Sequence, residues 1–151
     1  KITEKEFWDG FIKDTKAEGR LPLESLLQRQ FKRRFTVDEE MVKIPYKLQK
    51  SGLKIGIISN TIAPHAEIIR NSKSFEGFDE FILSNEVGFR KPEREIYELA
   101  LQILHVKPDE ALFVDDLPEN VEGANNVGIH GILFKNKDIL LQDLQKLGVE
   151  V

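Results

Sequence analysis

Two adjacent carboxylates, Asp115 and Asp116, follow directly after the apolar run 111–114, "ALFV", and Asn120 comes shortly after them. Two like charges at the end of a buried strand repel each other, so a cation has to make the pair tolerable. Carboxylate and amide oxygens are hard ligands that suit Mg2+, which binds proteins through one or two carboxylates together with water and substrate phosphate. The structural alternative is a strand end that is simply capped by aspartate. The pair therefore marks a candidate metal site.

A second polar group follows the apolar run 53–58, "LKIGII". Ser59, Asn60 and Thr61 come next, and Pro64 stands near the start of the helix expected after them. A hydroxyl and free backbone N–H groups at a helix N-terminus suit a phosphate group. The alternative is ordinary capping, because Ser, Thr and Asn also cap helices for structural reasons.

A third candidate follows the apolar run 79–83, "DEFIL". Lys91 precedes Pro92, a residue that can open a helix. An ammonium group fixed there could neutralise both a phosphate and a carboxylate. The alternative is an exposed loop lysine. We expect Lys91 to matter for phosphate and not for folding, so its substitution should change the melting temperature by no more than a few degrees, as for most surface residues.

The elements that must position these groups alternate along the chain. We expect strands over 53–58, 79–83, 111–114 and 131–134, and helices over 38–51, 64–71, 92–104, 120–127 and 139–147. Pro45 lies inside the first of these helices, so a kink or a restart is expected there. Such alternation predicts an α/β fold with a parallel sheet, in which ligands bind beyond the carboxyl ends of the strands. Residues 1–36 carry helix-spaced apolar stripes and no strand pattern.

Composition narrows the function classes further. The chain has 151 residues, a formal net charge of −4 and no cysteine. An acidic balance disfavours a general nucleic-acid binder, and the lack of cysteine excludes disulfides and thiolate metal sites. No apolar stretch reaches the ~18 residues of a membrane span, and no signal-peptide pattern opens the chain. We therefore expect a cytoplasmic protein that binds neither nucleic acid nor membrane. Its oligomeric state is not visible in the sequence.

Together, the three groups make the sequence resemble the haloacid dehalogenase (HAD) superfamily, most of whose members are Mg2+-dependent phosphatases. "IGIISNT" is similar to the second motif of that family, "VGFRKPEREIYELAL" to the third and "LFVDDLPENVEGANNVGI" to the fourth. The resemblance implies a Rossmann-like parallel sheet with helices on both faces over residues 37–151. It also implies that the helical residues 1–36 are the remnant of a cap.

The same resemblance implies a role for each candidate residue. Ser59 would hydrogen-bond the transferring phosphoryl group, with Asn60 beside it as a further phosphate-binding residue, and Lys91 would steady that group and the nucleophile. Asp116 would bind Mg2+, and Asp115 would be either a ligand or a hydrogen-bond acceptor behind the ligands. Asn120 would support the ligands from one helical turn away. The implied substrate is a small phosphorylated metabolite.

One motif of the family has no counterpart. The family's first motif is Asp-x-Asp at the end of a strand that precedes the cap, and its first Asp is the nucleophile; this sequence contains no Asp-x-Asp. The chain also begins with Lys1, so we expect an N-terminally incomplete hydrolase that is inactive by itself. The alternative is a non-catalytic pseudo-hydrolase that acts as a binding or regulatory domain.

The resemblance implies that the strand carrying the first motif lies at the centre of the sheet, between the expected strands 53–58 and 111–114. Three outcomes are open: a segment outside this sequence fills the slot, the two strands close up directly, or a second molecule donates a strand.

Two other readings fit less well. A response-regulator receiver domain also uses an acidic pair, a hydroxyl and a Lys-Pro, but there the acidic pair comes first along the chain and the Lys-Pro last. Here the order is Ser59, Lys91, Asp115. A dehalogenase of the same family needs no Mg2+, so the acidic pair favours phosphate chemistry.

Overall fold

The computed structural model describes residues 6, 9–10, 13–14 and 26–151, and the chain divides into two compact units, Lys1–Thr36 and Val37–Val151. In the first unit, α2 (Leu26–Arg34) ends in three basic residues, and the Phe31 and Phe35 rings pack with centroids 5.2 Å apart. Four of the helix-spaced apolar residues predicted from the sequence, Phe7, Trp8, Phe11 and Ile12, lie outside the described part of the chain. That this unit is the remnant of a cap stays a prediction.

The second unit contains four short strands, which pair in parallel. β1 (Gly56–Ser59) pairs with β2 (Glu80–Leu83), and β3 (Leu112–Asp115) pairs with β4 (His130–Leu133). The parallel α/β architecture expected from the sequence is therefore confirmed, and the candidate residues after each strand emerge at the carboxyl ends.

Six α-helices of the described second unit connect and cover these strands. They are α3 (Glu39–Lys50), α4 (Ala63–Arg70), α5 (Ser84–Val87), α6 (Arg94–Leu104), α7 (Pro118–Asn126) and α8 (Lys137–Lys146). Side-chain caps fix two of the starts: Asp38 accepts from the N–H of Met41 at 3.2 Å, and Asn136 accepts from that of Ile139 at 2.9 Å. Single 3-10 turns span Lys73–Phe75 and Pro108–Glu110. Among the described helices, none is long and apolar enough to cross a membrane.

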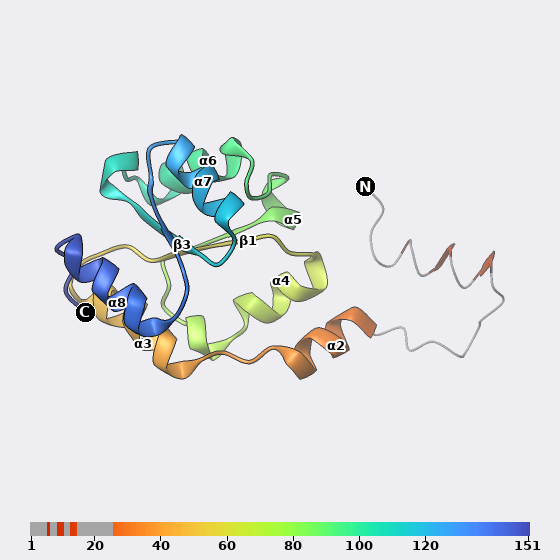
Figure 1. The fold of residues 1–151 in the computed structure, drawn as a ribbon. Helices are drawn as coiled ribbons and strands as arrows, with labels where there is room; N and C mark the ends of the chain where they lie inside the picture. The colour runs from red at the N-terminus through yellow and green to blue at the C-terminus, as the bar shows by residue number, and fades with distance from the viewer. Residues whose placement is uncertain (1–5, 7–8, 11–12, 15–25) are drawn as a thin grey trace. The chain divides into compact units, whose positions relative to one another are not determined.

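Helices pack on both faces of the strands (Figure 1). On one face α6 and α7 form the larger core, whose buried members are Ile82, Ile96, Tyr97, Ala100, Leu101, Ala124 and Ile129. On the other face α3 and α8 pack against β4, with a smaller buried cluster of Ile44, Ile132, Leu140 and Leu144. Ile58 of β1 and Phe113 of β3 both pack against the larger core, so one layer of helices holds the two strand pairs together.

Several boundaries differ from the sequence expectations. Helix α3 runs without a break through Pro45, so the expected restart is wrong. Its neighbour Ile44 is 5% exposed and packs in the core, and this packing offsets the loss of the backbone hydrogen bond that proline cannot donate. Strand β1 begins at Gly56 rather than at residue 53. The N–H of Ile55 donates to the Asp79 carboxylate at 2.7 Å, so it is not available for a ladder bond with β2. Helix α6 begins at Arg94, two residues after Pro92.

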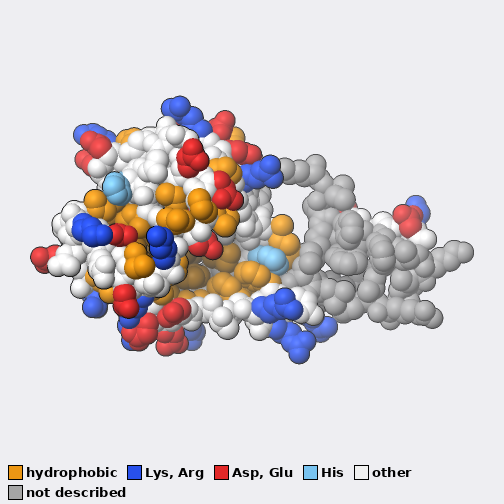
Figure 2. All heavy atoms as spheres, viewed as in Figure 1, with side chains coloured by type: hydrophobic (Ala, Val, Ile, Leu, Met, Phe, Trp, Pro, Cys, Tyr) orange, Lys and Arg blue, Asp and Glu red, His pale blue; other side chains and the backbone are white. Residues whose placement is uncertain are grey.

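The two strand pairs form separate ladders. Within the described residues, β1 bonds only to β2 and β3 only to β4, so β1 and β3 have not closed up on each other. The β3 side chains of Leu112 and Val114 are 41% and 39% exposed, which is unusual for the interior of a parallel sheet. Figure 2 shows apolar side chains gathered on one face of this unit among acidic and basic groups.

Candidate active site

A buried ion pair stands at the carboxyl end of β3. The Nζ atom of Lys91 lies 2.6 Å from Oδ2 of Asp115, and the two side chains are only 11% and 7% exposed. Lys91 comes from the segment between α5 and α6, and Asp115 is the last residue of β3. A charge-assisted hydrogen bond of this length is strong, and the low exposure protects it from screening.

The other carboxylate oxygen of Asp115 accepts two more hydrogen bonds. Oδ1 accepts from the backbone N–H of Leu117 and from Nδ2 of Asn120, both at 2.9 Å. Burial pushes the pKa of Asp115 upward, but the hydrogen bonds from Lys91, Asn120 and Leu117 outweigh it and hold the pKa below its ordinary value. The carboxylate is therefore ionised at neutral pH, with both oxygens engaged.

Tyr97 of α6 supports this cluster from the core. Its hydroxyl donates to the backbone carbonyl of Asn120 at 2.7 Å, and its ring meets that of Phe113 edge-on, with centroids 5.3 Å apart. The Lys91 ammonium lies 5.5 Å from the centroid of the Phe113 ring. Burial, followed by the negative charge of Asp115, raises the pKa of Tyr97 to about 12. Tyr97 thus stays a neutral donor that fixes the start of α7.

Asp116 differs sharply from its neighbour. It is exposed, and within the described residues its carboxylate has no hydrogen-bond or ion-pair partner. A hard carboxylate in that position fits Mg2+, which needs one or two such ligands beside water and phosphate. The described residues hold no group of three or more Asp, Glu, His or Cys side chains that would form a complete metal cage. The donor set therefore fits an open Mg2+ site.

Ser59 is the last residue of β1, and the two residues after it are tied down. The N–H of Thr61 donates to Oγ of Ser84 at 2.9 Å, and that hydroxyl donates back to the carbonyl of Thr61 at 3.1 Å. Asn60 makes two hydrogen bonds to the backbone of Lys91. Within the described residues, the Ser59 hydroxyl itself has no hydrogen-bond partner.

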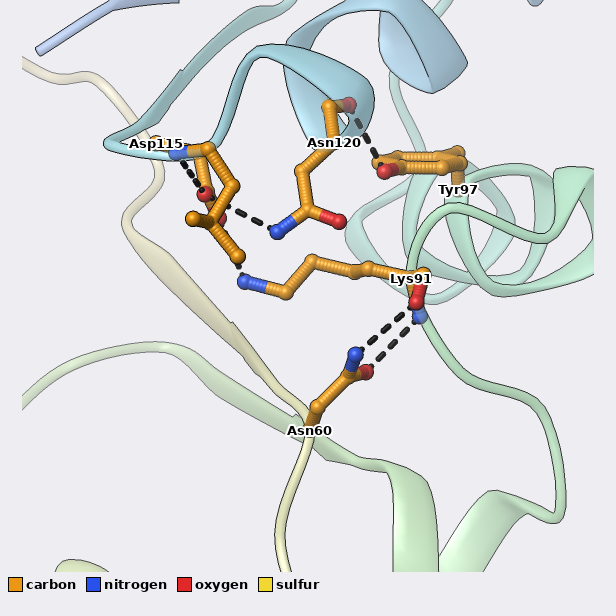
Figure 3. Close-up of polar contacts among 6 residues, drawn as sticks. Asn60, Lys91, Tyr97, Asp115 and Asn120 are labelled. Atoms are coloured by element: carbon orange, nitrogen blue, oxygen red, sulfur yellow. Dashed lines mark hydrogen bonds and ion pairs between the residues drawn. The ribbon is translucent and has the colours of Figure 1, made fainter.

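The structure thus links four of the six candidate residues directly. Asn60 bonds to Lys91, Lys91 to Asp115 and Asp115 to Asn120, as Figure 3 shows. Ser59 and Asp116 stand at the same ends of their strands, but within the described residues their side chains form no hydrogen bond with these four residues. Their roles toward phosphate and metal stay predictions.

Sequence reasoning missed two supporting residues, Tyr97 and Ser84. Ser84 directly follows the strand 80–83, the same kind of position that singled out Ser59, so the pattern could have found it. Tyr97 carries no comparable signal, because its helical spacing reads as ordinary core.

Comparison with known proteins decides the family. The model of the haloacid dehalogenase-like hydrolases matches residues 3–128. The chain belongs to this family. Its parallel strands with helices on both faces agree with the fold of that family.

Curated relatives of this HAD-like chain include phosphatases. It is 42% identical over 64 residues to flavin mononucleotide hydrolase 1 of Arabidopsis thaliana, a stretch that covers 42% of this chain and 26% of that protein. It is 37% identical over 93 residues to the glyceraldehyde 3-phosphate phosphatase of Methanothermobacter thermautotrophicus, covering 60% of this chain and 41% of that protein. The chain therefore spans less than half the length of these relatives.

Solved structures agree on the fold. A HAD family enzyme of Bacteroides thetaiotaomicron, in complex with magnesium and inorganic phosphate, superimposes with a TM-score of 0.73 at 23% identity, covering 89% of this chain and 70% of that one. A HAD phosphatase of Thermococcus onnurineus gives 0.71 at 24% identity, covering 95% and 71%. At these identities the likeness shows the shared fold.

Proposed function

We propose that this HAD-like hydrolase removes phosphate from a small phosphorylated metabolite, with Mg2+ as its cofactor, when it is completed by the family's nucleophile-bearing strand. The observation that carries the proposal is the buried Lys91–Asp115 pair at the carboxyl ends of the strands. A lysine held there by a carboxylate presents a fixed positive charge in a weakly screened place. The relatives named for flavin mononucleotide and glyceraldehyde 3-phosphate support phosphate monoesters as the substrate class.

Each residue then has one task. The Ser59 hydroxyl donates a hydrogen bond to a phosphoryl oxygen, and the Lys91 ammonium offsets the negative charge that develops on that group. Asp115 holds Lys91 in place, and Asn120 holds Asp115. Asp116 would hold Mg2+, which when bound supplies further positive charge to the phosphoryl oxygens.

In this proposal the nucleophile comes from a segment outside these 151 residues, because they contain no Asp-x-Asp. In the complete protein, an oxygen of the first Asp of the Asp-x-Asp motif would attack phosphorus while the bond to the substrate's alcohol oxygen breaks, and the second Asp would give the leaving alcohol its proton. Water would then attack the aspartyl-phosphate and return a proton to the second Asp, which releases inorganic phosphate and restores the first carboxylate.

Phosphate release from small monoesters tests the proposal. We would compare the 151-residue chain with a longer protein that carries an Asp-x-Asp strand ahead of residue 1, each with Mg2+ and with excess EDTA. Turnover is expected only in the longer protein and only with Mg2+. Substitution Asp116→Ala in that protein should raise the Mg2+ concentration needed for half-maximal rate. An unchanged Mg2+ requirement would refute Asp116 as a ligand.

The alternative is a pseudo-hydrolase that binds or regulates without turnover, and the lack of an Asp-x-Asp in the sequence favours it. The intact mass of the native protein separates the two. A mass of 17.4 kDa supports the pseudo-hydrolase, and a mass larger by roughly a strand and part of a cap supports the hydrolase.

A further inference from the structure

The side chain of Asn60 forms a two-bond clamp on the backbone of a residue 31 positions away. Its Nδ2 donates to the carbonyl oxygen of Lys91 at 2.8 Å, and its Oδ1 accepts from the N–H of Lys91 at 2.7 Å (Figure 3). Asn and Gln are the side chains whose amide offers a donor and an acceptor side by side. The clamp therefore depends on the amide and on the short stem of Asn60.

The clamp fixes a segment that has little regular structure of its own. Residues 88–93 connect α5 to α6, and apart from the Asn60 clamp their backbone hydrogen bonds are local: the N–H of Arg90 donates to the Glu93 carboxylate at 3.0 Å, and the N–H of Glu93 donates to the Arg90 carbonyl at 2.7 Å. Those local bonds shape the turn but do not attach it to the strands. Asn60 attaches it to the end of β1, one residue beyond Ser59.

The attachment sets where the Lys91 ammonium can reach. With its backbone held at the end of β1, Lys91 extends to Asp115 at the end of β3, so the side chain joins the ends of two strands that share no ladder. A long lysine side chain has many rotamers in solution, so its charge is held at one position only when both the backbone and the ammonium are fixed.

We propose that Asn60 is a positioning residue that acts on phosphate only through Lys91. Its amide oxygen and one amide N–H are engaged by the Lys91 backbone, so it holds the lysine while Ser59 and Lys91 contact the phosphoryl group. The part of the proposal that concerns phosphate rests on the proposed function. The part that concerns the Lys91–Asp115 pair stands on the geometry alone.

The first test follows the Lys91 ammonium by NMR in the 151-residue protein, with its signal assigned by its loss in Lys91→Met. In the wild type, the buried and ion-paired ammonium should exchange slowly with water. Asn60→Ala should speed this exchange several-fold. Asn60→Asp keeps the side-chain shape but removes the donor, and it should act in the same direction. Unchanged exchange in both variants overturns the proposal.

Gln49→Ala is the matched control. Its amide also bridges two segments, donating to the carbonyl of Gly77 at 2.6 Å and to Asp79 at 3.1 Å, but it lies away from Lys91 in the fold. It should lower thermal stability without changing the exchange of the Lys91 ammonium. If it speeds that exchange as much as Asn60→Ala does, the effect is general loosening and the proposal fails.

A double-mutant cycle with inorganic phosphate separates positioning from direct contact. Asn60→Ala should weaken phosphate binding in the wild type but add nothing in a Lys91→Met background. If the losses of phosphate affinity in the two single variants multiply in the double variant, Asn60 binds phosphate itself, which overturns the proposal. If neither the 151-residue protein nor the longer protein with the Asp-x-Asp strand binds phosphate, the proposed function is contradicted, and ammonium exchange alone decides the role of Asn60.

Discussion

At the scale of single residues, the site is a chain of hydrogen bonds in which every partner depends on the next. Asn120 and the Leu117 N–H satisfy one oxygen of Asp115, and Lys91 satisfies the other. A buried charge that loses its partner costs far more than the pair contributes when intact.

The Lys91 side chain is 11% exposed, so the sequence-based premise of an exposed loop lysine is wrong.

Lys91→Ala should therefore affect folding as well as activity. It leaves the Asp115 carboxylate buried without its cation, so we expect about 3 kcal/mol of lost unfolding free energy at neutral pH, measured by urea denaturation. The double variant Lys91→Ala/Asp115→Asn removes both charges and should recover part of that loss. A single variant as stable as the wild type would show that the pair contributes nothing. In the complete enzyme, Lys91→Ala should also abolish turnover.

Tyr97→Phe measures how much one buried hydroxyl contributes to the unfolding free energy. The change leaves the carbonyl of Asn120 without its donor, which should cost about 1 kcal/mol of unfolding free energy. The pKa of Tyr97 is raised from 10.0 to about 12, so the folded state favours the neutral phenol. The stability that the neutral Tyr97 phenol contributes is fully present below pH 10 and is lost as pH rises through 12. Urea denaturation of wild type and variant across this range should therefore show the stability gap closing, whereas a constant gap would contradict the assignment.

At the scale of elements, the approach of α7 to the Lys91 segment depends on a glycine. A Cβ at Gly123 would lie 2.9 Å from the carbonyl oxygen of Pro92 and 3.0 Å from the Tyr97 ring. Real Cβ atoms essentially never come as close to a backbone oxygen as 2.9 Å, so α7 reaches the segment only because position 123 has no side chain. The helix that carries Asn120 and the segment that carries Lys91 are brought together there.

Gly123→Ala should push these two elements apart. We expect a loss of about 1–3 kcal/mol in unfolding free energy from overpacking, despite the better helix propensity of Ala. Gly10→Ala is the control, because a Cβ there meets nothing within 4 Å. Thermal unfolding of both variants gives the comparison. A Gly123→Ala protein as stable as the control variant would show that α7 can shift freely.

The sequence predicted elements better than contacts. Strands 80–83, 112–115 and 130–133 lie within one residue of the expected runs, because apolar runs and glycine stops are local signals. The single turn α5 carries no such periodic signal and was not expected. The engaged state of Asp115 and the clamp of Asn60 depend on Lys91, 24 and 31 residues away, and no local pattern encodes pairings at that distance.

At the scale of the whole molecule, the second unit carries two parallel strand pairs side by side on one layer of helices. β1 and β3 each have a partner on one side only within the described residues. An open strand edge leaves every second N–H and C=O without a ladder partner, and a buried orphan costs about 1–3 kcal/mol. Leu112 and Val114 of β3 are also exposed, although apolar residues of a parallel strand are usually buried.

We predict that this open position accepts one further parallel strand. In the 151-residue protein, backbone amides of β1 and β3 that point away from β2 and β4 should exchange with deuterium far faster than those inside each pair. In a longer protein with an Asp-x-Asp strand ahead of residue 1, the same amides should become protected and phosphatase turnover should appear with Mg2+. Sedimentation shows whether the 151-residue chain is a monomer or a dimer. If the outer amides of β1 and β3 exchange slowly in a dimer, a second molecule donates the strand. If they exchange slowly in a monomer, β1 and β3 pair directly, and the predicted open position does not exist. Phosphatase turnover by the 151-residue chain would show that its own residues supply the nucleophile.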